Sequence, residues 1–232
     1  MALPILESAK FETVIPSTKK RIEYRPFLVK EEKILLMAQE SKDPDQILRA
    51  LKDIIYACTF EKVKVDDLAI YDMEYIFLQL RAKSVGETVD LQLKCSECGK
   101  DSPAQLDITS VKVQEPAKKV DPKIELTESI GIVARPVPVK EIGKVSDKAE
   151  DFVKMIALCI ESIYDSDNVY HRKDVSEKEL LAFVESLSRK QVEKIEEFIV
   201  NQPKLSHLHS FECINCKAKN TVTIEGLQSF FK

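Results

Sequence analysis

The stretches CSEC at residues 95–98 and CINC at residues 213–216 place two cysteine pairs far apart in a chain of 232 residues. A Cys-x-x-Cys turn presents two thiolates to one metal ion, and tetrahedral zinc takes four such ligands. Two turns of this kind therefore complete one site. One structural zinc ion shared by Cys95, Cys98, Cys213 and Cys216 would join the two halves of the chain, so these stretches decide the architecture.

Other uses of the two pairs are possible on sequence grounds. Two separate sites, one in each half, would need further soft ligands, but His171, His207 and His209 all lie in the second half. A redox pair normally begins a helix, where the thiol pKa is lowered, whereas both pairs here lie within alternating strand sequence. One closed site with four thiolates has no position for water or substrate, which is typical of a structural metal. We expect a histidine ligand only if one of the four cysteines is not involved.

The composition limits the classes of function. The chain has 35 Lys and Arg residues against 39 Asp and Glu residues, a formal net charge of −4. An acidic chain gains little from counterion release on nucleic acid, so protein partners are favoured over DNA or RNA. No stretch has the length of a membrane span, and the amino-terminal residues do not resemble a secretion signal. Six cysteines without such a signal indicate a reducing cytosol.

The two halves resemble diverged copies of one unit. The segment RPFLVKE at residues 25–31 recurs as RPVPVKE at residues 135–141. In each half it is followed by a helical apolar stripe, at residues 47–58 and 152–163, and then by a cysteine pair. Chance similarity is the alternative, but three features keep the same order. We therefore expect an internal duplication.

These patterns predict an α+β fold of two related halves, each with an edge strand, helices and a CxxC β-hairpin, joined through one zinc-ribbon-like site. We expect a first half at residues 1–115, a proline-containing linker at 116–123 and a second half at 124–232, packed as one compact unit. The predicted helices span residues 30–41, 43–58, 71–83, 147–165, 176–187 and 188–201, and the predicted strands span residues 20–24, 89–94, 105–108 and 130–139.

Signals for an enzyme are missing from the sequence. The five glycines are too scattered for a phosphate-binding loop, and neither GxSxG nor HExxH occurs. Cys58 and Cys159 fall on the apolar stripes and are interpreted as buried hydrophobic residues. The segment 71–80 carries aromatic residues on more than one face, which indicates either a partner surface or a central helix. The apolar Leu227, Phe230 and Phe231 could dock into a neighbouring protein or fold back on their own core.

The segments RPFLVKEEK at residues 25–33, DPDQILRALKDII at 43–55 and FLQLRAKSVGE at 77–87 are similar to the baseplate proteins of T-even-like contractile-tailed bacteriophages. The resemblance is to the hub-assembly subunit of the tail baseplate. It implies a noncatalytic role in building the baseplate hub in the host cytoplasm, through contacts with other hub and tail proteins of the virion. The zinc prediction rests on spacing and not on the family. A zinc-ribbon protein that binds nucleic acid or acts in transcription is the competing interpretation, and it requires a basic patch beside the cysteines.

Overall fold

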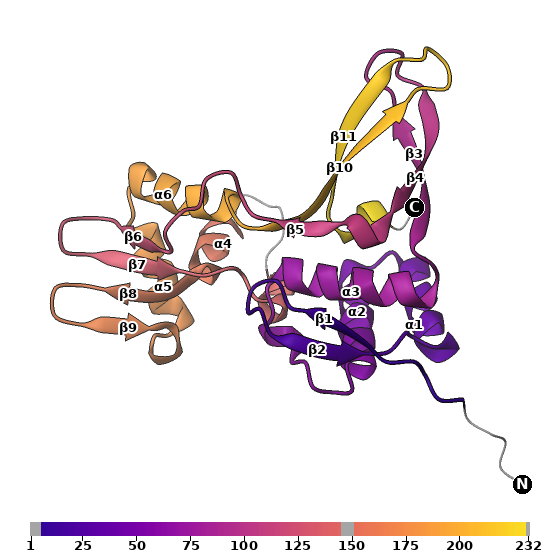
Figure 1. The fold of residues 1–232 in the computed structure, drawn as a ribbon. Helices are drawn as coiled ribbons and strands as arrows, with labels where there is room; N and C mark the ends of the chain where they lie inside the picture. The colour runs from indigo at the N-terminus through magenta and orange to yellow at the C-terminus, as the bar shows by residue number, and fades with distance from the viewer. Residues whose placement is uncertain (1–5, 145–150, 231–232) are drawn as a thin grey trace, which may run out of the picture. The chain divides into compact units, whose positions relative to one another are not determined.

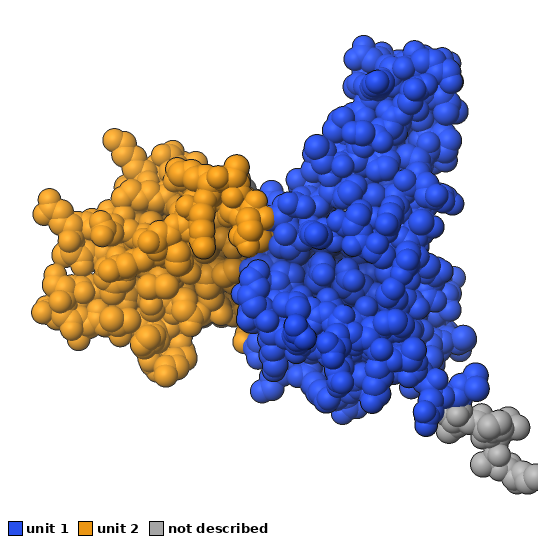
Figure 2. Space-filling model, in the orientation of Figure 1, with its two compact units in different colours: residues 1–114, 204–232 blue, residues 115–203 orange. Residues whose placement is uncertain are grey.

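A computed structural model describes residues 6–144 and 151–230, and they form an α+β fold of helices and small antiparallel sheets, as the sequence predicts (Figure 1). The chain divides into two compact units (Figure 2). Unit 1 comprises residues 1–114 and 204–232, and unit 2 comprises residues 115–203. These units differ from the consecutive halves read from the sequence, because the second cysteine hairpin groups with residues 1–114.

Three helices form the base of unit 1: α1 (Val29–Ser41), α2 (Pro44–Cys58) and α3 (Ile70–Ser84). Helix α2 begins where the sequence predicts, because Pro44 occupies the first turn and the Asp43 side chain accepts a hydrogen bond from the Asp45 N–H. Helix α3 is the central helix, since Met73 and residues 76–78 are buried. The alternative of a partner surface on α3 is therefore not needed to explain its aromatic residues.

Two β-hairpins extend from this base and carry the cysteine pairs. Strands β3 (Thr88–Lys94) and β4 (Asp101–Asp107) form the first, and β10 (Lys204–Glu212) and β11 (Lys219–Glu225) form the second. Strand β5 (Lys112–Gln114) pairs with β10, and β1 (Phe11–Val14) pairs with β2 (Arg21–Tyr24). The return strand β4 starts well before the predicted residue 105, because pairing with β3 continues up to the cysteine turn.

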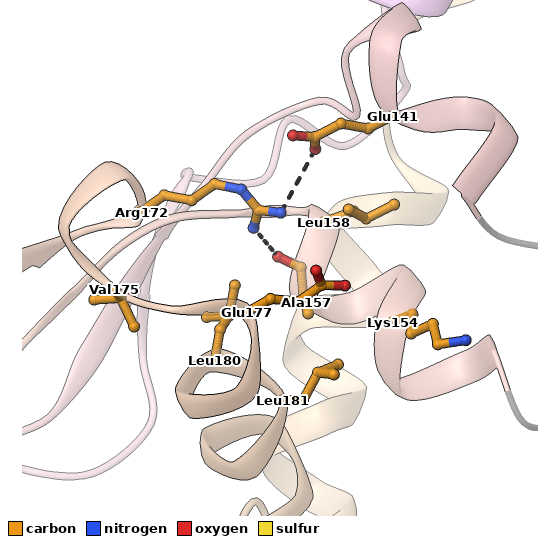
Figure 3. A pocket seen from close by; sticks show the side chains of 9 residues that line it. All are labelled: Glu141, Lys154, Ala157, Leu158, Arg172, Val175, Glu177, Leu180 and Leu181. Carbon is orange, nitrogen blue, oxygen red and sulfur yellow. Dashed lines mark hydrogen bonds and ion pairs between the residues drawn. The ribbon is translucent and has the colours of Figure 1, made fainter.

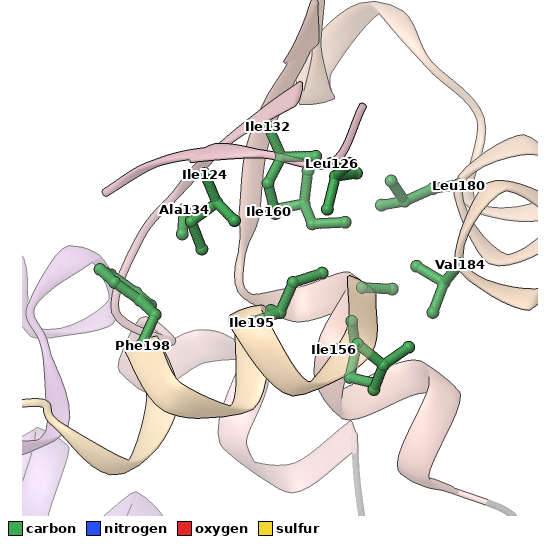
Figure 4. Packing of buried hydrophobic residues seen from close by; sticks show 12 residues of the cluster. Ile124, Leu126, Ile132, Ala134, Ile156, Ile160, Leu180, Val184, Ile195 and Phe198 are labelled. Atoms are coloured by element: carbon green, nitrogen blue, oxygen red, sulfur yellow. The ribbon is translucent and has the colours of Figure 1, made fainter. Parts of the chain in front are cut away.

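Unit 2 is a four-stranded antiparallel sheet packed against helices. The strands are β6 (Lys123–Glu125), β7 (Gly131–Ala134), β8 (Ile160–Tyr164) and β9 (Val169–His171), in that order across the sheet. The helices are α4 (Phe152–Leu158), α5 (Glu177–Glu185) and α6 (Arg189–Val200), and α5 and α6 begin with the capping boxes that the sequence predicts. Their buried side chains meet those of the sheet in one core (Figure 4), which includes Ile124, Leu126, Ile132, Ile156, Ile160, Leu180, Val184, Ile195 and Phe198.

The predicted helix 147–165 is wrong in its second half. Helix α4 ends at Leu158, and the chain continues as strand β8, which pairs with β7 and β9. The β-branched Ile160 and Ile163 suit a strand, and their spacing is compatible with both periods over so short a run. The predicted strand 130–139 is also shorter, since β7 ends at Ala134 and a 3₁₀ segment follows at Val139–Lys144. Residues 147–150 lie outside the described residues.

The two RPxxVKE segments make matching contacts. In unit 1 the Arg25 guanidinium pairs with the Glu31 carboxylate at 2.9 Å. The backbone N–H of Arg25 donates to the carbonyl of Cys58, also at 2.9 Å. In unit 2 Arg135 pairs with Glu141 at 2.8 Å. The Arg135 N–H donates to the carbonyl of Cys159, also at 2.8 Å. Both glutamates and both cysteines are buried, so each unit contains the same ion pair anchored to the end of a helix.

Candidate metal centre

The four cysteines of the two hairpins meet at one place in unit 1. Their Sγ atoms all lie within 4.8 Å of one another. Two of the distances join sulfurs of different hairpins, with 3.6 Å between Cys95 and Cys216 and 3.6 Å between Cys98 and Cys213. A disulfide needs about 2.05 Å, so these sulfurs are not bonded to each other. The arrangement is close enough to hold one metal ion.

The backbone turns around the two pairs are the same. In the first turn the backbone N–H of Cys95 donates to the carbonyl of Lys100, and the N–H of Gly99 donates to the carbonyl of Cys95. In the second turn the N–H of Cys213 donates to the carbonyl of Ala218, and the N–H of Lys217 donates to the carbonyl of Cys213. Gly99 has φ +68°, a left-handed conformation that glycine adopts without strain. Lys217 occupies the same place with φ 60°. The sequence signal for a tight turn was therefore visible in the first pair and hidden in the second.

Two polar residues connect the hairpins in a reciprocal way. The Ser102 hydroxyl donates to the Cys213 sulfur at 3.4 Å and accepts a hydrogen bond from the Ile214 N–H. The Asn220 amide donates to the Cys95 sulfur at 3.4 Å, and its oxygen accepts from the Ser96 N–H. Ser102 and Asn220 are both buried and each follows the first cysteine of its own pair by seven residues.

Sequence reasoning missed Ser102 and Asn220 as hydrogen-bond donors to the sulfurs. Polar residues at matched offsets after the two CxxC pairs were the available signal. Hydrogen bonds to a sulfur stabilise its anionic form and fix the orientation of a metal ligand.

The sulfurs differ in their affinity for protons. The Ser102 hydroxyl, together with the backbone N–H of Cys216, lowers the pKa of Cys213 to about 5. At Cys216 the Ala218 N–H lowers the pKa, but burial and the neighbouring thiols outweigh it and raise the pKa to about 12. Four sulfurs this close cannot all carry charge by themselves. A divalent cation removes that repulsion, which is why thiolate clusters bind metal with release of protons.

The remaining cysteines and histidines lie outside this cluster. Burial raises the pKa of Cys58 and of Cys159 to about 11, as expected for thiols that serve as small hydrophobic residues. His207 and His209 lie on the same face of β10, half-buried, with ring centroids 6.1 Å apart. Neither belongs to the group of potential metal ligands found among the described residues.

The surface beside the cysteine turns carries both signs of charge. Lys94 lies directly opposite Asp101 in the first hairpin, and Lys219 lies opposite Glu212 in the second. Lysines that face carboxylates across a strand pair lose much of their value for binding phosphate. At two positions beside the cysteine turns, a carboxylate therefore offsets the lysine that nucleic-acid binding would use.

A separate cavity of about 220 Å³ lies in unit 2 (Figure 3). Arg172 donates to the carbonyl of Ala157 and lies 3.7 Å from Glu141, which also pairs with Arg135. These bonds tie the carboxyl end of α4 to the segment that precedes it. None of the nine lining residues is a serine, cysteine or histidine, and its charged groups are Glu141, Lys154, Arg172 and Glu177.

Nearly the whole chain is similar to phage baseplate proteins. Residues 8–232 match a family model described as T4 bacteriophage base plate protein. The chain is also similar to the baseplate hub assembly protein gp26 of Enterobacteria phage T4, with 24% identity over 225 residues, which cover 96% of this chain and 97% of that protein. No solved structure matches. None of the described helices has both the length and the apolar character that crossing a bilayer requires. The chain belongs to the T4 bacteriophage base plate protein family.

Proposed function

We propose that this protein is a noncatalytic assembly protein of a contractile phage tail, which binds other baseplate hub proteins through a scaffold closed by one structural zinc ion. The observation that carries the proposal is the four-sulfur cluster, which joins two hairpins distant in sequence in a chain similar to a hub assembly protein.

The distances favour zinc as the ion. Zn–S bonds of about 2.3 Å in a tetrahedron place the sulfurs about 3.8 Å apart. Two separations here are 3.6 Å, and all of them lie within 4.8 Å, so small side-chain rotations suffice. Four thiolates leave no open coordination position, which favours a structural role over a catalytic one. Cys95, Cys98, Cys213 and Cys216 would be the ligands.

The repeated contacts support an internal duplication. Each copy contains an Arg–Glu ion pair inside RPxxVKE and a cysteine hairpin. Each also contains a buried cysteine whose backbone carbonyl accepts a hydrogen bond from the backbone N–H of the arginine. The reciprocal bonds of Ser102 and Asn220 relate the two hairpins to each other as two copies would be related. On this proposal the zinc site is the place where the two copies of the hairpin pair.

The role of the ion would be to make a rigid platform. Residues 204–232 return to unit 1 after the whole of unit 2, and the metal would fix that return. The nucleic-acid alternative is less well supported, because the net charge is −4 and lysines beside the cysteines face carboxylates. We expect no retention of duplex DNA that depends on salt concentration.

The proposal is tested by complementation. A phage that lacks this gene is grown on cells that supply either the wild-type protein or the Cys213→Ser variant. We expect tails only with the wild type, and hub proteins that remain unassembled with the variant. Cys159→Ala, which changes a buried cysteine outside the cluster, is the matched control and should complement. Full complementation by Cys213→Ser would refute the role of the metal site, and normal tails without the gene would refute the assembly role. Mass spectrometry of finished tails then distinguishes a virion component from a transient factor.

A further inference from the structure

A groove of about 400 Å³ lies in unit 2 between the β8–β9 hairpin and helix α5. Its apolar lining comes from Ile130, Ile163, Val175 and Phe183. The last three are half-buried and pack against the core of the unit, so the floor of the groove is firmly supported. Ile130, which also lines the groove, is 38% exposed. An apolar floor of this kind can accept an apolar side chain of another molecule.

The polar lining of the groove is acidic. Asp165, Asp174 and Glu179 all line it, and none of the three makes an ion pair with any residue that the structure describes. The N–H groups of Asp167 and Asn168 lower the pKa of Asp165, and the Ser176 hydroxyl lowers the pKa of Glu179. Both are therefore negatively charged at neutral pH.

One cation lies against a lining residue. The Lys123 ammonium is 5.0 Å from the centre of the Tyr164 ring. One positive charge against three carboxylates still gives the groove a net negative charge. Anionic ligands and nucleic acid are disfavoured at such a surface, and cationic groups are attracted. Because the floor is apolar, a free metal ion or polyamine would use only part of the groove.

We propose that this groove binds a segment of another tail protein that carries an apolar side chain flanked by lysine or arginine. The apolar side chain would occupy the floor beside Phe183 and Val175, and the cationic groups would pair with Asp165, Asp174 and Glu179. This inference rests on the proposed function, because it names the chemistry of the partner that an assembly protein would hold. It also places a partner surface in unit 2, apart from the cysteine hairpins of unit 1.

The test uses the full-length, metal-loaded protein and three variants. The first, Asp165→Asn with Asp174→Asn and Glu179→Gln, removes the charges. Its asparagine at 165 keeps one oxygen for the N–H groups of Asp167 and Asn168 and turns the Tyr170 hydroxyl from a donor into an acceptor, and its glutamine at 179 still serves in the capping box. The second, Ile130→Ala, shortens the exposed apolar wall. The matched control, Asp121→Asn with Glu185→Gln and Glu193→Gln, neutralises three carboxylates of the same unit that do not line the groove.

The probe is an array of fifteen-residue peptides tiled across the tail proteins encoded by the same phage, followed by fluorescence anisotropy with the strongest binders. We expect the binders to be basic with at least one large apolar residue. We expect the triple variant to weaken them about tenfold, Ile130→Ala to weaken them less, and the control to bind like the wild type.

Three results would overturn the inference. The first is that the strongest binders carry no positive charge. The second is that the triple variant and its control lose the same affinity for the peptides. The third is that the same concentration of spermidine displaces the peptides from the wild type and from the triple variant. Intact tail proteins give the separate test of the proposed function. If they bind the wild type and the triple variant equally, the groove is not the partner surface and the assembly role stands. If none binds the wild type, the assembly role fails as well.

Discussion

Replacing Cys213 by serine is the perturbation that the metal site predicts most sharply. Serine is a poor zinc ligand, and three thiolates hold the ion much less tightly than four. The substitution therefore releases the second hairpin from the first. Cys98 and Cys213 are separated by 115 positions, so the ion closes a long loop in the unfolded chain. We expect a large loss of stability in unit 1.

The magnitude follows from loop closure. If the whole intervening chain is unfolded, closing a loop of this length is worth about 4.8 kcal/mol. If unit 2 stays folded, only residues 99–114 and 204–212 remain flexible within the loop, and the value falls to about 3.5 kcal/mol. The variant should thus lose about 3.5 to 5 kcal/mol of unfolding free energy. With a typical urea dependence this lowers the unfolding midpoint by about 2 M.

Urea unfolding of the purified protein, followed by circular dichroism with and without a zinc chelator, measures this loss. The chelator should bring the wild-type curve onto that of Cys213→Ser and should leave the variant unchanged. Cys159→Ala lies in unit 2 outside the cluster and should keep the full response to the chelator. The reasoning is refuted if wild type and Cys213→Ser unfold at the same urea concentration, or if the chelator shifts neither.

The other predictions concern the hydrogen-bond donors to the sulfurs, the thiols and the buried ion pair. Ser102→Ala and Asn220→Ala should each weaken zinc binding about 10- to 100-fold in competition with a chromogenic chelator, and unchanged affinity would exclude their role as supports of the ligands. In the metal-loaded native protein no thiol should react quickly with a disulfide reagent. Chelation should release four reactive thiols, and the two buried thiols outside the cluster should react only after unfolding. Six thiols that all react quickly in the native protein would contradict the structure. Glu31→Gln should cost about 3 kcal/mol at neutral pH by leaving Arg25 unpaired. Burial raises the pKa of Glu31, but the hydrogen bonds from Arg25 and from the Leu28 N–H lower it by more than burial raises it. The pKa of Glu31 in the folded protein therefore lies below its value in the unfolded chain. The stabilisation is present above the unfolded pKa and disappears as pH falls through the folded pKa, so the cost of Glu31→Gln should shrink in acid, and a cost independent of pH would contradict this.

Much of the fold could be predicted from local signals. The sequence predicts helix α2 to within a residue because a capping aspartate, a proline in the first turn and a wide apolar stripe all agree. The meeting of the four sulfurs could be predicted because ligand chemistry relates residues that no local pattern connects. The failure at residues 159–165 has the opposite cause. A short apolar run fits helix and strand equally, and pairing with β7 and β9 decides in favour of the strand.

Long-range packing explains what the sequence could not provide. The return of residues 204–232 to unit 1 depends on the pairing of β10 with β5 and on contacts between hairpins, which have no signature in sequence order. The groove of unit 2 depends on the placement of Asp165 and Glu179 on different elements. The predicted helix 147–165 ends at Asp165, whereas the side chain of this residue organises the β8–β9 turn.

Metal analysis combined with X-ray absorption of the purified protein tests the central claim most directly. We expect one zinc ion per chain and a shell of four sulfurs at about 2.3 Å, with no nitrogen or oxygen ligand. Protein purified from zinc-containing medium that holds no zinc, or a shell that includes imidazole or water, would contradict the account.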